Sequence, residues 1–376
     1  MKFIHTADWH LGKTLKNQSL IEDQRYILKK FLQIVDDNKV DAIVIAGDIY
    51  DRNIPPEEAV DLFNWILNKL IIERNLPVLC ISGNHDSKSR LNFGSRIFDN
   101  SNLHIRTKLI ADMTPVVLND DYGEVYFSLI PYFEPIDVKK LFNLDDETEL
   151  SYDEAGKILV DAARSKIPSN SRSVAVTHAF ITGGVESGSE KKLPGGLGQV
   201  NPAHFKDYNY TALGHLHGST LTNKNIRYSG SLLKYSFDEE KQSKSVTIVE
   251  IDSSGNVKVD YNLPLTPIRD VRVIRGSIED ILKVEPKSDD YISVQYEGLN
   301  VPNLNAKLRN KFINLLEFKP ADKNSAQFED TIKRQENISN VELFKNFFKA
   351  TTGDNLNEEE LFAVTTLIED MEKSNY

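Results

Sequence analysis

The strongest constraint on the fold is a short apolar stretch, Ala42–Ala46, that is followed at once by Gly47 and Asp48. Five small or β-branched apolar residues in a row predict a strand buried on both faces, as in a parallel sheet covered by helices. Open α/β sheets bind their ligands beyond the carboxyl ends of such strands. A carboxylate there can give one oxygen to each of two cations. We therefore expect Asp48 to bridge two divalent metal ions, with further ligands from neighbouring loops.

The first 264 residues alternate between strand and helix periodicity. A first strand is predicted at Lys2–Thr6, and Ser19 and Glu22 have the spacing of a capping box that would start a helix running to Asn38. A second helix is predicted after Pro56. Other segments have the pattern of strands, at 77–81, 125–130, 173–177, 210–213, 226–229 and 246–251, or of a helix, at 152–163. This alternation predicts a layered α/β architecture.

Two closely spaced prolines, Pro264 and Pro267, predict a linker, which gives a first domain at 1–264. The runs at 271–274, 278–282, 291–296 and 304–316 then predict strand–helix–strand–helix, so that 265–330 forms a small second domain. Two amphipathic helices are expected in the tail, 331–376, the second starting at a capping box of Asn357 and Glu360. Their aromatic faces need a surface to cover, either on this chain or in a groove of a partner protein.

The charge balance argues against a chain that holds nucleic acid unaided. The net charge is −11, whereas phosphate binding normally shows as a basic surface. Much of the acid lies in the tail, where Asn340–Tyr376 carries eight Asp or Glu against three Lys. A polyanionic substrate would need local attraction or a basic partner.

Cysteine usage and the absence of long apolar runs indicate the compartment. The single cysteine, Cys80, lies in an expected strand and is predicted to be a buried structural thiol. The sequence shows neither a signal peptide nor a run of the roughly 18 apolar residues that a membrane span needs. We therefore expect a cytoplasmic protein without a membrane partner.

Metal-binding or acid–base residues follow five of the expected strands. They are Asp8 and His10, Asp48, Asn84 and His85, His178, and His215 and His217. Each group alone has a structural explanation, and His5, within the first strand, is expected to be a packed core histidine. Five such strand ends together favour a metal site. Carboxylate, imidazole and amide donors without thiolate suit Mn, Fe or Zn, and Mg is possible. Metals about 3.5–4 Å apart can activate water and hold both oxygens of a phosphoryl displacement.

These motifs resemble those of the calcineurin-like metallophosphoesterases. The matching segments are Asp8-x-His10, Gly47-Asp48-x-x-Asp51, Gly83-Asn84-His85-Asp86, His178 and Gly214-His215-x-His217. The resemblance implies an α/β/β/α sandwich with two metal sites. One metal would be bound by Asp8, His10, Asp48 and His217, and the other by Asp48, Asn84, His178 and His215. His85 would lie near the phosphate, where it protonates the leaving sugar oxygen or stabilises the transition state.

Within that superfamily, His5–Gly12, Ser82–Asp86 and Tyr228–Leu233 are similar to the bacterial nucleases that work with the coiled-coil ATPase SbcC. This resemblance implies a DNA exonuclease on duplex ends that also cuts single strands and opens hairpins, with Mn as the metal. DNA repair, recombination and replication are the implied processes. It also implies a small α+β capping domain at 265–330 that contacts DNA, and tail helices at 331–376 that bind the ATPase. The chain would form a homodimer within a heterotetramer.

Two further groups are candidates for the site. Asp51 stands where related archaeal and eukaryotic nucleases tend to carry histidine, and we expect it to orient His85 rather than to face solvent. Lys191 and Lys192 lie in the glycine-rich segment 183–200, which is expected to be a mobile loop. They are either solvated or bind the phosphates of the substrate.

Two rival functions stay open at this point. The same site suits a phosphatase or an enzyme for small phosphodiesters, and Mn-dependent turnover of phosphomonoesters far above that of DNA would favour it. A scaffold that recruits an ATPase without cleaving anything would be inactive on every DNA end. No Gly-x-x-x-x-Gly-Lys motif is present, so any dependence on ATP would belong to a partner.

Overall fold

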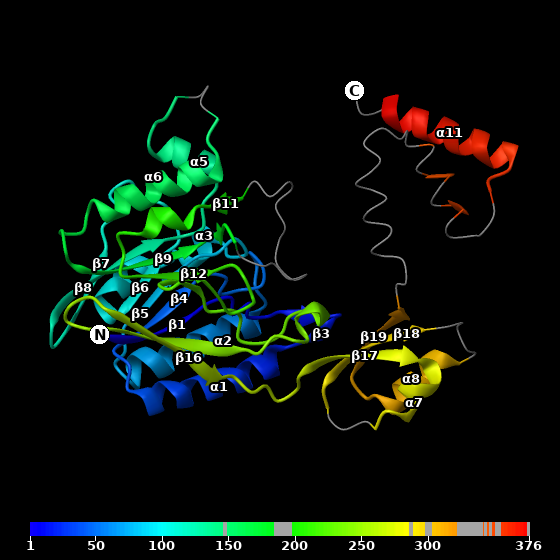
Figure 1. Ribbon diagram of the computed structural model, residues 1–376, viewed down its shortest axis with the longest axis horizontal. Helices are drawn as coiled ribbons and strands as arrows, with labels where there is room; N and C mark the ends of the chain where they lie inside the picture. Colours follow the sequence, from blue (N-terminus) through cyan, green and yellow to red (C-terminus); the bar gives the residue numbers. More distant parts are fainter. Residues whose placement is uncertain are drawn as a thin grey trace. The chain divides into compact units, whose positions relative to one another are not determined.

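The computed structural model of the chain describes residues 1–145, 149–183, 198–285, 289–297, 303–321, 341, 344–345, 348–349 and 355–373. Residue contacts divide the chain into two units, Met1–Lys319 and Pro320–Tyr376. The first unit contains two six-stranded sheets and a separate three-stranded sheet (Figure 1).

The first large sheet has the strand order β16-β15-β1-β4-β5-β6. The strands are Lys2–Thr6 (β1), Ala42–Ala46 (β4), Val78–Ile81 (β5), Leu103–Arg106 (β6), Ser245–Ile251 (β15) and Val257–Pro264 (β16). Strands β1, β4, β5 and β6 pair in parallel, whereas β15 runs antiparallel to β1 and to β16. The loops that follow β1, β4 and β5 therefore meet at one edge of this sheet.

The second large sheet has the strand order β13-β14-β12-β9-β8-β7. The strands are Val116–Asp120 (β7), Gly123–Ile130 (β8), Arg172–His178 (β9), Tyr210–Gly214 (β12), Thr220–Asn223 (β13) and Ile226–Tyr228 (β14). Strands β8, β9, β12 and β14 are parallel, and the outer strands β7 and β13 are antiparallel to their neighbours. Here the residues after β9 and β12 share one edge.

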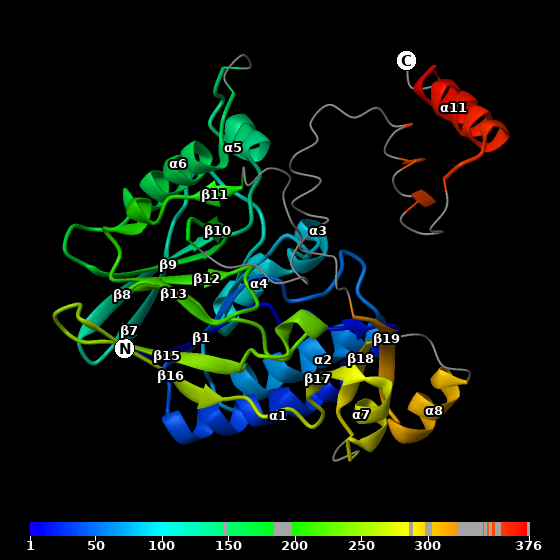
Figure 2. The same cartoon turned by 45° about the vertical axis from the view of Figure 1, so that its right-hand side comes forward.

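The two sheets stack face to face, and helices cover both outer faces. Alternating residues of β4 enter two different cores: Val44 lies between the sheets, whereas Ile43 and Ile45 lie beneath the helices. Helices α1 (Ile21–Asn38) and α2 (Glu57–Leu67) cover the first sheet, and α5 (Pro135–Leu141) and α6 (Tyr152–Arg164) cover the second. Figure 2 shows these two pairs on opposite sides of the sheets. The predicted α/β/β/α sandwich is confirmed.

One predicted helix start is wrong. Helix α1 begins with Leu20 as its N-cap and without a side-chain cap, and Ser19 instead belongs to the short strand β3 (Gln18–Ser19). The side chain of Gln24, in the first turn, donates to the carbonyl of His10 at 2.7 Å and accepts from the Gly12 amide at 2.9 Å. This tertiary anchor to the loop after β1 replaces the local capping box that the sequence pattern predicted.

Short elements connect the main layers. They are β2 (Thr14–Leu15), the π-helix η1 (Asn68–Ile72), α3 (Lys88–Leu91), α4 (Ser95–Phe98), η2 (Asp99–Ser101), β10 (Phe180–Ile181), β11 (Gln199–Val200), η4 (Pro202–Phe205) and η5 (Phe237–Glu239). The predicted burial of Cys80 in β5 and of His5 in β1 is confirmed, because both side chains are fully buried. His5 contacts the Tyr210 hydroxyl at 3.0 Å and the Leu213 carbonyl at 3.1 Å, as expected for a core histidine.

The small domain contains β17 (Val271–Ser277), α7 (Ile278–Lys283), β18 (Tyr291–Glu297), α8 (Leu304–Lys311) and β19 (Leu315–Pro320). Strands β17 and β18 are parallel, and the sheet order is β17-β18-β19. Ile274, Val294 and Leu308 belong to a hydrophobic core of its own. The predicted helix at 304–316 is wrong in its last part, because the chain becomes extended at Phe312 and then forms the third strand.

In the second unit, helix α11 spans Glu358–Lys373. Its predicted capping box is confirmed: the Glu360 amide donates to the side chain of Asn357, and the Asn357 amide donates to the Glu360 carboxylate, both at 2.9 Å. The first predicted tail helix lies partly outside the described residues. Within the described part of the chain, no helix has the length and apolar character to cross a membrane.

Candidate metal centre

The polar residues predicted at five strand ends come together around Asp48. One oxygen of this carboxylate, Oδ2, lies 3.5 Å from Nε2 of His10, which follows β1, and 3.5 Å from Nε2 of His178, which ends β9. Asp48 follows β4 and is buried between these two imidazoles. The sandwich thus places one carboxylate between ligands from both sheets, which is the arrangement that a bridging ligand requires.

Two donor groups share this carboxylate. On one side, Nε2 of His217 lies 3.0 Å from Nε2 of His10, and the ligand atoms of Asp8, His10 and Asp48 lie within 4.8 Å of one another. On the other side, Oδ1 of Asn84 lies 3.0 Å from Nε2 of His178 and 3.3 Å from Nδ1 of His215. These seven residues, which the motifs singled out, thus lie close together around Asp48.

A buried oxygen in the first group lacks a protein partner. Oδ2 of Asp8 is inaccessible to solvent and has no hydrogen-bond donor among the described residues, although Oδ1 accepts from the His215 amide at 2.9 Å. Leaving a buried carboxylate oxygen unpaired is costly. A cation at this position would satisfy it, and the surrounding oxygen and nitrogen donors suit a divalent transition metal.

The ligand loops hold strained backbone conformations. Four of the predicted ligand residues have positive φ: Asp8 at 53°, His10 at 43°, Asp48 at 50° and His215 at 104°. Each such residue costs about 1–3 kcal/mol and persists where the surrounding structure over-determines it. Here the amides of Asp8 and His10 donate to the carbonyls of Gly47 and Asp48 at 3.0 and 2.9 Å. The loops after β1 and β4 therefore fix each other in the conformation that aims the ligands inward.

Two glycines allow the loops to approach closely. A Cβ at Gly83 would lie 2.1 Å from Oδ1 of Asp48, and a Cβ at Gly214 would lie 1.9 Å from the carbonyl oxygen of Ala46. Both distances are far below van der Waals contact. The glycines that precede Asn84 and His215 are thus required for the second donor group to reach Asp48.

The electrostatics of the centre show where protons are held in the absence of cations. Burial raises the pKa of Asp8 to about 7, against the lowering effect of His178 and His217. Burial alone would lower the pKa of His178, but the neighbouring Asp48 carboxylate raises it to about 9. Burial lowers the pKa of His215 to about 3, which keeps that imidazole neutral. Divalent cations would replace the protons on Asp8 and His178.

Buried residues outside the two donor groups support the ligands. Oε1 of Glu239 lies 3.0 Å from Nδ1 of His217, and its Oε2 accepts from Nζ of Lys244 at 2.6 Å. Such a carboxylate fixes the tautomer and ring orientation of a metal-binding histidine. The Asp86 carboxylate accepts from the amides of Ile49 and Gly83, and thereby joins the loops after β4 and β5.

The sequence did not identify these supporting roles. Glu239 stands in the run Asp238-Glu239-Glu240-Lys241, which has the composition of a solvated segment. Its burial depends on tertiary packing, for which the local pattern holds no signal. Asp86 belongs to the Gly83–Asp86 motif, and this motif was the only feature of the sequence that pointed to a role for Asp86 in the site.

His85 and Asp51 lie together at the rim of the centre. Nδ1 of His85 contacts the main-chain carbonyl of Asp51 at 2.7 Å, and the His85 ring stands edge-on to that of His10, with centroids 4.8 Å apart. The predicted contact between Asp51 and His85 is present, but the backbone makes it. The carboxylate of Asp51 instead pairs with Lys13 at 2.8 Å. Lys191 and Lys192 lie outside the described residues.

A cavity of about 210 Å³ opens beside the second donor group. Asn84, His178 and His215 form one wall, and the aromatic rings of Tyr132, Phe133, Tyr152 and Phe180 line much of the remainder, with Glu134 also present. The rings of Tyr132, Tyr152 and Phe180 are partly exposed. A planar group attached to a phosphate in the metal centre fits the chemistry of this cavity.

Comparisons with known proteins show which family the chain belongs to. Residues 1–219 match the family of calcineurin-like phosphoesterases. The SbcD component of the nuclease SbcCD from Staphylococcus epidermidis is 36% identical over 375 residues, which cover 95% of each chain. The protein of that name from Staphylococcus saprophyticus is 36% identical over 365 residues, covering 95% of this chain and 94% of that one. The calcineurin-like phosphoesterase YfkN of Bacillus subtilis, a solved structure, is 12% identical with a TM-score of 0.38, covering 69% of this chain and 88% of that one.

Proposed function

Because the chain belongs to the calcineurin-like phosphoesterases, and within them to the family of the SbcD component of the nuclease SbcCD, we propose that it hydrolyses DNA phosphodiesters at a centre of two divalent metal ions. The observation that carries this proposal is the position of Asp48, whose Oδ2 lies 3.5 Å from both His10 and His178. A shared carboxylate between two donor groups is the feature that a binuclear phosphoesterase needs.

The two donor groups support a proposed set of ligands for each cation. Asp8, His10, Asp48 and His217 would hold one cation, and Asp48, Asn84, His178 and His215 the other. When bound, such a pair supplies Lewis-acid stabilisation of the phosphate and a water nucleophile at neutral pH. The mixed oxygen and imidazole donors support Mn as the metal, with Fe, Zn or Mg as possible substitutes.

His85 supplies a proton to the leaving group in this proposal. The Asp51 carbonyl accepts from Nδ1 of His85, which assigns the exchangeable proton to Nε2. The His85 amide donates to Oδ1 of Asp48 at 2.9 Å, so the ring is tied to the shared ligand. As water attacks the phosphorus and the bond to O3′ breaks, protonated His85 would give its Nε2 proton to O3′, and one proton of the water would pass to solvent while the other stays on the product phosphate. Asp51 then positions His85 through its main chain.

The aromatic cavity supports a nucleotide substrate. A phosphate at the cation that Asn84, His178 and His215 would hold would place a flanking base near the rings of Tyr132 and Phe180. Stacking of a base on an aromatic side chain tolerates any sequence, as a nuclease acting on DNA ends requires. Duplex ends, single strands and hairpins are the proposed substrates, because each offers bases that can leave the stack. Lys191 and Lys192 are proposed to bind backbone phosphates.

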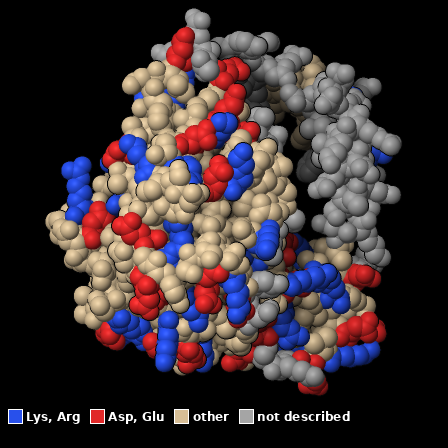
Figure 3. Space-filling view, turned by 60° about the vertical axis from the view of Figure 1, so that its left-hand side comes forward, with Lys and Arg blue, Asp and Glu red and all other residues tan. Residues whose placement is uncertain are grey.

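The charge of the surface supports a basic partner. Acidic and basic side chains are interspersed over the face shown in Figure 3, and the net charge is −11. We propose that a coiled-coil ATPase of the SbcC type supplies the positive surface for DNA and binds the tail helices at 331–376. The capping domain at 265–330 is proposed to contact the DNA beside the active centre.

A homodimer is the proposed state of this chain within the complex. Phe93 is 83% exposed and Ile97 is 73% exposed, and they lie in and beside the short helices α3 and α4. Large apolar side chains exposed together favour a protein interface. A second copy of the chain would cover them in a heterotetramer with two copies of the ATPase.

End-labelled hairpin DNA tests the proposal. We expect cleavage with Mn, weaker cleavage with Mg and stimulation by the SbcC-type ATPase. His85→Ala should lower turnover about 10²–10⁴-fold with metal content unchanged, the range for loss of a general acid. His104→Ala, which removes a histidine that pairs with Asp99 away from the centre, is the matched control. Metal-loaded protein that turns over phosphomonoesters far faster than every DNA end would instead identify a phosphatase.

A further inference from the structure

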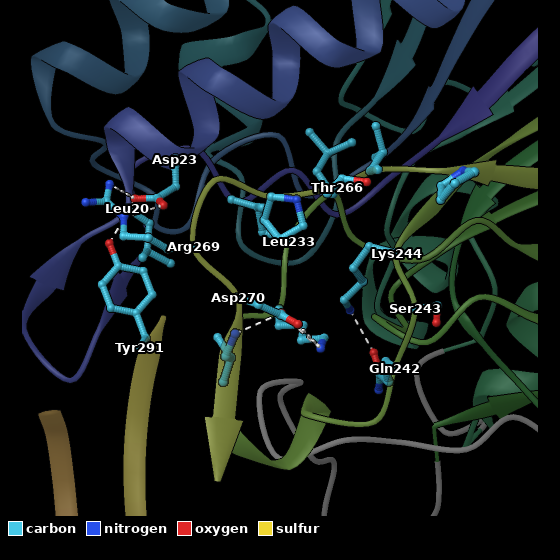
Figure 4. A pocket seen from close by; sticks show the side chains of 16 residues that line it. Leu20, Asp23, Leu233, Gln242, Ser243, Lys244, Thr266, Arg269, Asp270 and Tyr291 are labelled. Atoms are coloured by element: carbon cyan, nitrogen blue, oxygen red, sulfur yellow. Dashed lines mark hydrogen bonds and ion pairs between the residues drawn. The ribbon is translucent and has the colours of Figure 1, made fainter. Parts of the chain in front are cut away.

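Among the described residues, four charged contacts join the capping domain, here Arg269 to the end of β19, to the sandwich, beside the buried side chains of Val271 and Tyr291, which belong to the core of the sandwich. Arg269 makes two hydrogen bonds to Asp23 of α1, at 2.9 and 2.7 Å, and Tyr291 donates to the same carboxylate at 2.9 Å (Figure 4). The other three pairs lie across the same junction. They are Lys234 with Asp270 at 2.9 Å, Arg275 with Glu240 at 2.7 Å, and Lys16 with Glu317 at 2.6 Å.

The side chain of Glu240 bonds to two residues of β17. Its Oε2 accepts from the Val273 amide at 3.2 Å and from Arg275 at 3.1 Å, so it holds both the main chain and a side chain of that strand. Its carbonyl accepts from Nζ of Lys234 at 2.8 Å, and Lys234 also pairs with Asp270 at the start of the domain. Movement of β17 must therefore move the backbone of Glu240 or break these bonds.

The residue before Glu240 is the one that supports the metal centre. Glu239 is fully buried, and its carboxylate joins Nδ1 of His217 to Nζ of Lys244. Consecutive Cα atoms are only ~3.8 Å apart, and Glu239 ends the short helix η5. One residue thus orients a ligand of the first cation while its neighbour holds the capping domain.

We propose that the placement of the capping domain sets the metal affinity of the His217 side of the centre through the adjacent residues Glu239 and Glu240. The inference rests on the proposed function in requiring that the centre binds metal ions. Docking of β17 holds Glu240, which keeps the Glu239 carboxylate on Nδ1 of His217 and presents Nε2 of that ring to the cation. Loss of docking frees η5, so that the ring is no longer fixed. Coupling is reciprocal, so a ligand that displaces the domain weakens this site, and metal binding favours the docked position.

The sandwich and the capping domain offer a matched pair of variants. Glu240 and Glu317 are carboxylates of the same junction with similar exposure, 14% and 18%, and each pairs with a half-exposed cation, Arg275 at 52% and Lys16 at 49%. Glu317 also accepts from Ser293, within its own domain. Only Glu240 of the two stands next to a residue that contacts a proposed ligand. Glu240→Ala and Glu317→Ala therefore remove comparable contacts. Only Glu240→Ala changes a residue that is adjacent to Glu239 and, through it, linked to His217.

Titration of the full chain with Mn in the absence of DNA, followed by calorimetry and by the spin resonance of free Mn, measures the two sites. We expect Glu240→Ala to weaken one site about fivefold, the lower end of typical coupling between sites, and to leave the other unchanged. Arg275→Ala, on the capping side, should weaken the same site by a smaller factor, and Arg275→Lys should restore it. Glu317→Ala should bind Mn as the unchanged chain does.

Three results would overturn the proposal. Equal Mn affinity for Glu240→Ala and the unchanged chain would show that the step from Glu240 to His217 transmits nothing. An equal loss in Glu317→Ala would assign the effect to the junction as a whole. If Glu240→Ala weakened Mn binding and Arg275→Ala did not, the effect would come from Glu240 itself and not from the docking of β17. Failure of the unchanged chain to bind two Mn ions is a different result, and would remove the proposed function as well.

Discussion

The metal centre and the capping junction are held together by different kinds of contact. In the centre, the main chain sets the ligands: amides of one loop donate to carbonyls of the next, and four ligands keep positive φ angles. At the junction, ion pairs of partly exposed side chains such as Arg275 and Lys16 accompany the buried contacts of Val271 and Tyr291 with the core of the sandwich. Buried main-chain bonds resist change, whereas exposed ion pairs contribute about 0–1 kcal/mol each. This chain therefore combines a metal centre that main-chain bonds hold in place with a domain junction in which exposed ion pairs take part.

Asp48→Asn is the most severe test of the preformed centre. The amide keeps the shape of the side chain but removes the charge shared by both donor groups, so we expect DNA cleavage to fall at least about a thousandfold, equivalent to roughly 4 kcal/mol of transition-state stabilisation. Asp41→Asn, at the amino end of the same strand, where Asp41 accepts from the Lys2 amide, is the control and should cleave normally. Substantial cleavage by Asp48→Asn, measured with saturating Mn, would show that one donor group suffices.

The pH dependence of Mn affinity is a second test of the metal centre. Without metal, the pKa values of two ligands are raised, to about 7 for Asp8 and about 9 for His178, so at neutral pH a cation must displace protons from both residues. A raised pKa means tighter proton binding, so Mn affinity must rise with pH. We expect about tenfold per pH unit for each proton displaced, hence a steep rise from pH 6 to 7 and a shallower one up to pH 9.

Calorimetry in buffers of different ionisation enthalpy counts the protons released on binding. Release that falls from about two at pH 6 to about one at pH 8 fits the two pKa values. Mn affinity that is flat over this range would mean that the centre does not hold protons in place of cations.

The difference between the two regions also explains what the sequence could predict. The meeting of the candidate ligands at one place was predictable because each follows an apolar run whose residues, such as Ile43 and Val44, define the strand whatever else surrounds it. Glu239 was not predictable, because only the folded chain buries it against His217 and Lys244. The start of α1 was predicted wrongly for the same reason, since Gln24 anchors it to the loop after β1. In both cases, contacts between residues far apart in the sequence determined what the local pattern could not predict.

Asp51→Asn has the smallest expected effect, because Asp51 makes both a main-chain contact and an ion pair and the substitution removes only the ion pair. The Asp51 carbonyl holds Nδ1 of His85, and its carboxylate pairs with Lys13, with the two side chains 16% and 17% exposed. The substitution removes the ion pair and keeps the main-chain contact, so His85 should stay in place. A partly exposed pair is worth about 1 kcal/mol or less, so we expect turnover on hairpin DNA to fall up to about fivefold with metal content intact.

Lys13→Met should give a similar loss if the pair itself matters. Turnover that is unchanged would remove Asp51 from the working site, and a loss as large as that of His85→Ala would mean that the carboxylate, rather than the carbonyl, orients the histidine.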